Sequence, residues 1–161
     1  MQGQWIGTYA SNSNGNILLD IDDFGTYYGG YAVLRANDPR LPIVYVGFNT
    51  ADKSNVANFT ATPMAFDGFF NPQAWSVVQS SFPNTSFPDS ADVTLRLENG
   101  TLFVNWTTNL GVGSAQIGPS HASLPSTYFA STEVTNWDSF SQYVRTLSPY
   151  DFMFRGQSSN A

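Results

Sequence analysis

Residues 93–107 read VTLRLENGTLFVNWT, and this stretch decides the fold. Two runs rich in β-branched and aromatic residues, 93–97 and 101–107, flank the sequence Glu98-Asn99-Gly100. The Asn-Gly pair favours a tight turn because both residues tolerate positive φ. The stretch therefore predicts a β-hairpin.

The same kind of segment recurs from the N-terminus to about residue 134, where short apolar runs are closed by Gly, Asn, Asp or Pro. This spacing is typical of consecutive antiparallel strands. Pro63 indicates an edge or an irregular end in one segment, and Gly29-Gly30 predicts a bend in another. Besides the hairpin, strands are expected at 4–9, 16–22, 26–35, 43–48, 56–66, 114–117 and 128–134.

Eight or nine strands with mostly hairpin-length links predict a mainly β fold, an antiparallel barrel, with a two-sheet sandwich as the alternative. The opening sequence, residues 3–9 (GQWIGTY), precedes an alternating strand and a Gly-rich third strand, and resembles the start of small lipocalin-like or avidin-like barrels. Residues 67–91 are a long connection with several aromatic anchors, which we expect to pack over an open end or an edge of the sheet.

Charge and composition exclude several classes of protein. Only 11% of the 161 residues are charged and 16% are aromatic, which is unlike a disordered chain or a coiled coil. A formal net charge of −6 argues against nucleic acid or an anionic membrane as a partner. The absence of Cys removes disulfides, thiolate nucleophiles and Cys-based zinc sites. The N-terminus lacks the features of a signal peptide, so a cytoplasmic protein is expected.

The character of the sequence changes at residue 135. Trp137, Phe140, Val144 and Leu147 recur at helical spacing, and Ser148-Pro149 ends the predicted helix. Residues 151–154 then read as a short strand. The sequence therefore predicts a barrel or sandwich domain over 1–134 and a separate helix plus strand over 135–161.

The block 134–158 resembles the beginning of the FRG domain family, which is named for an aromatic-Arg-Gly motif near its N-terminus. The matching residues are Phe154-Arg155-Gly156-Gln157, placed after an amphipathic helix and a Ser-Pro break. The resemblance covers roughly 25 of 161 residues. It implies a bacterial or phage protein in which this chain is an N-terminal part, with an FRG domain following in the same polypeptide.

Arg155 and Gly156 form the candidate site that this block suggests. An Arg at a strand end can hold a pyrophosphate bidentately, and the Gly lets a phosphate approach closely. ADP-ribosyltransferases begin their NAD site with a similar aromatic-Arg-Gly, so an NAD-using fragment is one alternative. The later motifs of those enzymes have no counterpart after residue 157, and a strand-end arginine without a ligand is the competing interpretation.

Other catalytic and metal-binding patterns are incomplete. Asp20, Asp22 and Asp23 do not continue into a calcium loop, because Phe24 and Tyr31 stand where ligands are required. His121 is the only histidine, and no nucleophile-elbow motif is present. No catalytic residue, metal or cofactor is therefore assigned, and we do not expect this chain to be an enzyme.

Aromatic residues are the remaining candidates for binding. A barrel of this size holds at most one small ligand, and rings that line it can also stack on a sugar. Neighbours on a strand point to opposite faces, so Tyr27 and Tyr28 cannot both point inward. The predicted binding residues are Tyr27, Tyr28, Tyr31, Trp75 and Trp106.

These patterns support a non-enzymatic accessory, ligand-sensing or interaction domain of an FRG-domain protein. The alternative is a self-contained lipocalin-like module that binds a small apolar or sugar ligand. Either type of module with an exposed strand edge would also be prone to self-association, so a homo-oligomer is a further expectation.

Overall fold

Ten antiparallel strands form one sheet in the part of the chain that the computed structural model describes, residues 1–119. The order across the sheet is β5-β8-β9-β10-β1-β2-β3-β4-β6-β7. The strands are β1 (Gly3–Ala10), β2 (Asn14–Asp23), β3 (Tyr28–Ala36), β4 (Val44–Thr50), β5 (Val56–Ala61), β6 (Met64–Phe66), β7 (Pro72–Gln73), β8 (Ala91–Glu98), β9 (Thr101–Thr108) and β10 (Gly111–Pro119).

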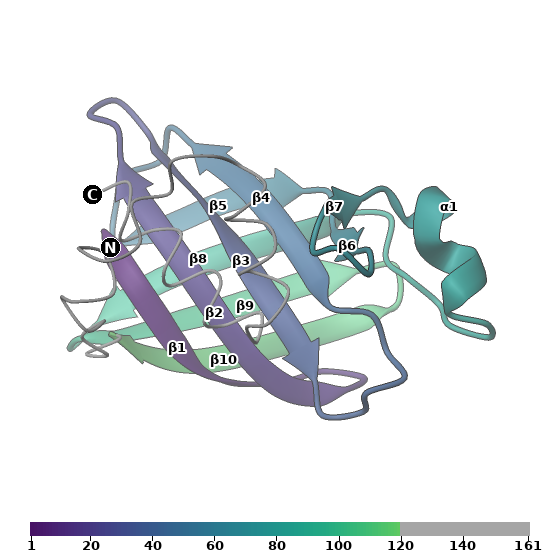
Figure 1. Ribbon diagram of the computed structural model, residues 1–161. Coiled ribbons are helices and arrows are strands. Elements are labelled where there is room, and N and C mark those ends of the chain that lie inside the picture. The colour runs from purple at the N-terminus through teal and green to yellow at the C-terminus, as the bar shows by residue number, and fades with distance from the viewer. Residues whose placement is uncertain (120–161) are drawn as a thin grey trace, which may run out of the picture. The chain divides into compact units, whose positions relative to one another are not determined.

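The sheet curls until β4 and β5 lie side by side, which gives a barrel-like fold (Figure 1). Around the barrel, eight strands follow one another in chain order, β1-β2-β3-β4-β5-β8-β9-β10, and β10 pairs with β1. The short strands β6 and β7 extend from the β4 side. The predicted mainly β, barrel-like fold is confirmed. The described strands belong to one sheet, so they do not form the two-sheet sandwich.

Three predicted elements lie outside the described residues: the strand at 128–134, the helix from 135 and the strand at 151–154. The chain divides into the units Met1–Ser120 and His121–Ala161, of which only the first is described here. The predicted domain boundary at 134/135 therefore stays a prediction.

The hairpin predicted over residues 93–107 forms in the structure. Strands β8 and β9 pair from Ala91↔Thr108 to Glu98↔Thr101. Asn99 and Gly100 occupy the turn with φ of 51° and 77°. The turn residues thus set the register, and the register places every second side chain of both strands inside the barrel.

Residues 56–66, predicted as one strand, form two strands that bond to opposite edges of the sheet. The first part, β5, pairs with β8 along its whole length, from Val56↔Arg96 to Ala61↔Ala91. The second part, β6, pairs with the start of β4 through Val44↔Ala65. Buried Pro63 lies between the two parts. Because proline cannot donate a backbone hydrogen bond, the ladder changes partner at this point.

Gly30 has a different role from the predicted bend. The β2–β3 ladder runs without a break through Gly29 and Gly30, so there is no bulge. A Cβ on Gly30 would lie 1.9 Å from the backbone oxygen of Asp20. The glycine therefore permits a close approach of β2 to β3, which a larger residue would prevent.

Large side chains fill one end of the barrel, which we call the closed end. Trp5, Ile21 and Leu102 are buried there, and the Trp5 indole Nε1 donates a hydrogen bond of 2.9 Å to the backbone oxygen of Met1. The inward-facing residues that make the main core are Trp5, Tyr9, Ile17, Leu19, Ile21, Ala32, Ala57, Leu95, Leu102, Val104, Ala115 and Ile117.

The long connection 67–91 carries a second, smaller core. It contains the helical turn α1 (Trp75–Val78) and the 3₁₀ turn η1 (Gln79–Ser81). Trp75 stacks on Phe87 with ring centroids 4.6 Å apart, and buried Val78 and Ala65 belong to the same cluster. This cluster fixes the position of the segment that follows it, residues 85–88.

The structure predicts how the seam between β4 and β5 is stabilised. Phe48 and Phe59 stack across it with centroids 4.6 Å apart and planes within 10°. Because Phe59 is only partly buried, Phe59→Ala should lower the free energy of unfolding by about 2 kcal/mol, measured by urea denaturation.

The matched control is Phe69→Ala, since the Phe69 side chain is 62% exposed. This substitution should change stability by less than about 0.5 kcal/mol. Equal effects of the two substitutions would show that the seam does not depend on this aromatic pair.

Candidate functional site

A cavity of about 210 Å³ occupies the barrel interior near the end opposite to the closed end. Its rim consists of the β1–β2 turn, the β3–β4 loop, the β9–β10 turn and the segment 85–88. The prediction that the long connection packs over an open end is thus confirmed for residues 85–88. We call this the open end.

The cavity wall is apolar because each strand turns its hydrophobic alternate positions inward. The two strands that flank the seam contribute Val44, Val46 and Phe48 from β4 and Phe59 from β5. The other apolar residues of the wall are Ile17, Leu19, Ala32, Leu34, Ala36, Leu41, Pro42, Pro63, Phe87, Pro88, Ala91, Val93, Leu95, Val104 and Leu110.

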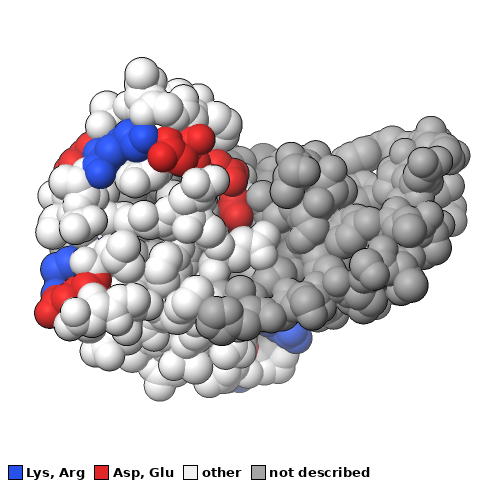
Figure 2. All heavy atoms as spheres, turned by 90° about the vertical axis from the view of Figure 1, so that its left-hand side faces the viewer, with Lys and Arg blue, Asp and Glu red and all other residues white. Residues whose placement is uncertain are grey.

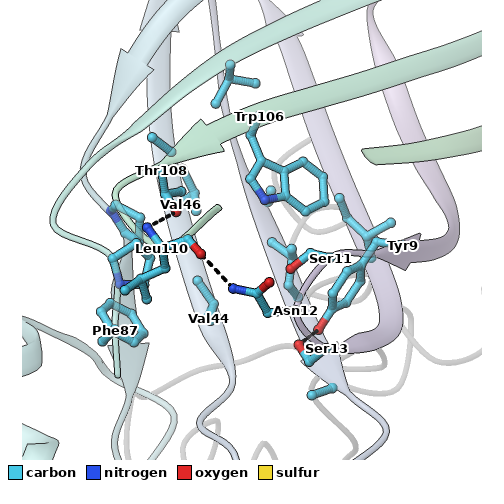
Figure 3. A pocket seen from close by; sticks show the side chains of 18 of the residues that line it. Tyr9, Ser11, Asn12, Ser13, Val44, Val46, Phe87, Trp106, Thr108 and Leu110 are labelled. Atoms are coloured by element: carbon cyan, nitrogen blue, oxygen red, sulfur yellow. Dashed lines mark hydrogen bonds between the residues drawn. The ribbon is translucent and has the colours of Figure 1, made fainter. Parts of the chain in front are cut away.

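Two aromatic rings define one side of the cavity (Figure 3). Trp106 from β9 and Tyr9 from β1 approach with ring centroids 6.0 Å apart at 58°. Strand β10 lies between β9 and β1, and its Gly113 is the register partner of Trp106. A Cβ at Gly113 would lie 2.2 Å from the indole, so the glycine leaves the space that the Trp106 ring fills.

Hydrogen bonds tie the rim of the open end together. The Asn12 amide Nδ2 donates to the backbone oxygen of Leu110 at 2.8 Å, which joins two turns far apart in the sequence (Figure 3). The backbone N–H of Leu110 donates to the Thr108 hydroxyl at 3.0 Å. The backbone N–H of Asp89 donates to Asn109 Oδ1 at 3.1 Å. The opening is thus framed by cross-linked turns.

Only one of the predicted aromatic binding residues, Trp106, lines the cavity. Trp75 belongs to the smaller core and reaches the rim only through its stacking on Phe87. Tyr31 stacks on Tyr45 at 5.8 Å, and burial raises the pKa of the Tyr45 hydroxyl. The structure therefore does not bring these predicted residues together in one site.

Tyr27 and Tyr28 lie at the closed end. Tyr27 is 40% exposed and stacks on Phe24. Tyr28 packs against the main core, and Lys53 Nζ lies 5.0 Å from the centre of its ring. The other two predicted site residues, Arg155 and Gly156, lie outside the described residues.

Sequence reasoning overlooked the polar residues of the β1–β2 turn as site residues. Ser11, Asn12 and Ser13 line the cavity together with Tyr9. The sequence offered one indication of this site: in the first strand, Trp5, Gly7 and Tyr9 alternate and share one face, which places the adjoining turn at the end of that face. The types of residue in the turn do not indicate a site, because Ser and Asn are common in turns on protein surfaces.

A second hollow lies on the outer face of β5, β8 and β9 and is lined by polar side chains. Two of its threonine hydroxyls are already paired: Thr60 donates to Asp92 at 2.7 Å and Thr94 donates to Asn58 at 2.7 Å. Phe59 and Trp106 also belong to its lining, but both rings pack against the main core. They therefore do not form an exposed platform on which a sugar would stack.

Most of the basic side chains within residues 1–119 pair with a nearby carboxylate. Lys53 Nζ lies 2.5 Å from Asp23 Oδ1, and this hydrogen bond lowers the pKa of the Asp23 carboxyl. Arg96 pairs with Glu98. In Figure 2, blue and red side chains lie next to each other and are separated by wide uncharged areas. Within residues 1–119, no group of three or more His, Asp or Glu residues could hold a metal ion.

No helix within residues 1–119 combines the length and the apolar character needed to cross a bilayer.

Asp20 on β2 is the most perturbed carboxyl of the described chain. It is 3% exposed, and its Oδ2 has no hydrogen-bond partner among the described residues. Burial raises its pKa to about 7, with further contributions from the negative charge of Asp22 and from a hydrogen bond to Asp22. Asp20 does not line the cavity, so this carboxyl bears on stability rather than on the contents of the barrel.

Comparisons with known proteins give no relative for this chain. No family model, no curated protein and no solved structure matches it.

The buried Asp20 predicts a stability that falls as pH rises. The ordinary carboxyl pKa of 3.8 applies to the unfolded chain, whereas the folded value is about 7. Between these values the folded state holds more protons, so the free energy of unfolding decreases with increasing pH, by at most about 4 kcal/mol. Urea denaturation at pH 5 and pH 8 covers most of this range, over which the decrease should be about 2.5 kcal/mol.

Asp20→Asn should remove most of this pH dependence and should be more stable than the parent protein at pH 8. Asp92→Asn, which alters an exposed carboxylate on β8, is the matched control and should leave the dependence in place. A parent protein equally stable at pH 5 and pH 8 would contradict the prediction.

Proposed function

We propose that the barrel binds a small, largely apolar molecule in its interior cavity. The observation that carries this proposal is the combination of an apolar wall with an opening at one end of the barrel. An apolar cavity of ~150 Å³ is already large enough to bind benzene. A cavity of about 210 Å³ therefore suits a compound of one to three small rings, or a short chain of similar volume.

The physical driving force is the removal of apolar surface from water and the recovery of dispersion contacts that an empty cavity lacks. Apolar cavities of this type are poorly hydrated, so the ligand displaces little bound water. For a ligand of 10 to 17 non-hydrogen atoms, a dissociation constant on the order of 1–10 µM is expected.

A sugar is the poorer candidate for this cavity. Each sugar hydroxyl that leaves water needs a hydrogen-bond partner, and the deeper wall around Leu19, Ala32 and Leu95 offers only hydrocarbon. The apolar member of the two predicted ligand classes is therefore the one we propose.

This binding activity also suits the wider proposal of a ligand-sensing accessory domain in an FRG-domain protein. That proposal depends on residues 134–158, which lie outside the described residues. Its test is the intact mass of the protein from its native source. A mass well above 17.6 kDa supports it, and a mass of 17.6 kDa contradicts it.

Titration with N-phenyl-1-naphthylamine, an uncharged dye that becomes fluorescent in apolar surroundings, tests the proposed binding. We expect a blue-shifted signal that saturates at one dye per chain. Val46→Trp places an indole in the cavity and should weaken binding at least tenfold. Val112→Trp is the matched control, because Val112 is 69% exposed and outside the cavity wall, and it should bind like the parent protein.

The unfolding midpoint of each variant shows whether it is folded. If Val46→Trp does not fold, Leu34→Trp provides a second way to fill the cavity from β3. Unchanged dye binding by a folded cavity-filling variant would place the dye on the surface and overturn the proposal.

A further inference from the structure

The cavity wall contains no charged side chain within residues 1–119. This is unusual for a site that takes an ionised ligand, because a buried charge requires a partner of opposite charge or several hydrogen bonds. The polar groups of the wall are all neutral, and they gather at the open end: Tyr9, Ser11, Asn12, Ser13, Thr85, Ser86 and Thr108.

We propose that the ligand is an uncharged molecule with an apolar body and a single hydroxyl or carbonyl group, which the hydroxyls of Tyr9 and Ser13 bind at the open end. This inference rests on the proposed function and adds the chemical class of the ligand. The apolar body lies toward Leu19, Ala32 and Leu95, and the polar group lies at the rim.

The Tyr9–Ser13 pair is the part of the rim that is ready to accept a ligand. The two hydroxyl oxygens are 3.3 Å apart, and either one can donate. This separation is longer than the ~2.7–2.8 Å of a strong O–H···O bond, so the pair loses little when a ligand oxygen replaces the contact. The Tyr9 side chain is held by its burial, with 7% of its surface exposed.

The other polar groups with defined contacts are engaged in structural bonds. Asn12 Nδ2 donates to the backbone oxygen of Leu110. The Thr108 hydroxyl accepts from the backbone N–H of Leu110 and lies 3.3 Å from the backbone oxygen of Gly111. A ligand that used the Asn12 amide would break the link between two turns, and a ligand that used the Thr108 hydroxyl would break bonds within the β9–β10 turn.

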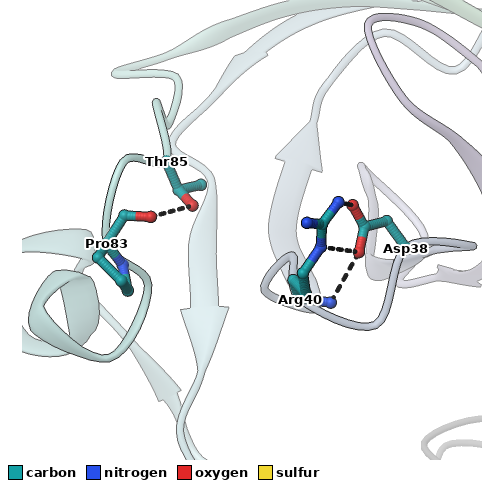
Figure 4. A network of polar contacts seen from close by, with 4 residues as sticks. All are labelled: Asp38, Arg40, Pro83 and Thr85. Carbon is teal, nitrogen blue, oxygen red and sulfur yellow. Dashed lines mark hydrogen bonds and ion pairs between the residues drawn. The ribbon is translucent and has the colours of Figure 1, made fainter.

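The charged residues of the loops at the rim do not favour an ionised ligand either. Arg40 precedes Leu41 of the wall, but its Nε and Nη2 both donate to the Asp38 carboxylate, at 3.0 and 2.8 Å (Figure 4). These hydrogen bonds lower the pKa of Asp38 to about 2, so the pair stays ionised and self-compensated at neutral pH. Asp89, which follows Pro88 of the wall, would repel an anion.

Competition between four naphthalene compounds and the dye N-phenyl-1-naphthylamine tests the ligand class at constant ring size. The compounds are naphthalene, 2-naphthol, naphthalene-2-sulfonate and the cation 2-(aminomethyl)naphthalene, all at pH 7. We expect 2-naphthol to bind most tightly, naphthalene three- to tenfold more weakly, and both ions at least tenfold more weakly than 2-naphthol.

Tyr9→Phe tests the hydroxyl pair directly. It should weaken 2-naphthol three- to tenfold and leave naphthalene unchanged, because only the alcohol uses the hydroxyl group. Tyr27→Phe is the matched control, since it removes a tyrosine hydroxyl at the closed end, and it should change neither affinity. Ser13→Ala should reproduce the effect of Tyr9→Phe.

The outcomes separate the two proposals. If the dye does not bind, the proposed function fails. If the dye binds and an ionised compound competes as well as 2-naphthol, the cavity function stands and the uncharged ligand class is wrong. If 2-naphthol binds equally to the parent, Tyr9→Phe and Ser13→Ala proteins, the hydroxyl pair does not hold the polar group.

Discussion

Closure of the barrel depends on residues 56–66, which bond both to β8 and to β4, two strands that do not bond to each other. Strand β5 completes the ladder with β8, and β6 completes the ladder with β4. The bend at Pro63 joins the two ladders covalently. This connection holds the two sides of the sheet together along with side chains such as Phe48 and Phe59, because no backbone ladder joins β4 to β5 in the described residues.

The size of the inward-facing side chains decides where the barrel interior is filled and where it is hollow. At the closed end, Trp5, Ile21 and Leu102 fill the space between opposite walls. Toward the open end the inward positions include Ala32, Ala36 and Ala91, which are too small to meet across the barrel. The cavity is therefore a consequence of a change in side-chain size along strands whose spacing is fixed by the ladders.

Much of the fold could be predicted from the sequence because local chemistry determined it. The Asn99-Gly100 turn fixes the β8–β9 hairpin, and strict alternation fixes which residues of each strand share a face. The division of 56–66 between two partners could not be predicted beyond an irregularity at Pro63. Strand pairing between distant segments depends on the closure of the whole sheet, and no local pattern encodes it.

The candidate site shows the same limit. Alternation predicts that Tyr27 and Tyr28 point to opposite faces, but it does not say which face is the interior or how near a ring lies to the open end. Of the two predicted tryptophans, Trp106 lines the cavity, whereas Trp75 stacks on Phe87 of the rim segment and does not line it. Tyr9 and Ser13 meet because the β1–β2 turn folds back over the end of its own strand, which becomes visible only in three dimensions.

A ligand in the cavity would act on the seam as well as on the interior. Val44, Val46 and Phe48 face the cavity from one side of the seam, and Phe59 and Pro63 face it from the other. A molecule that contacts both sides adds dispersion contacts where the backbone supplies no ladder. Because the unfolded chain has no such cavity, bound ligand stabilises the closed barrel in proportion to its concentration relative to its dissociation constant. Ligand binding and closure of the barrel are therefore thermodynamically linked, because the ligand contacts both sides of the seam.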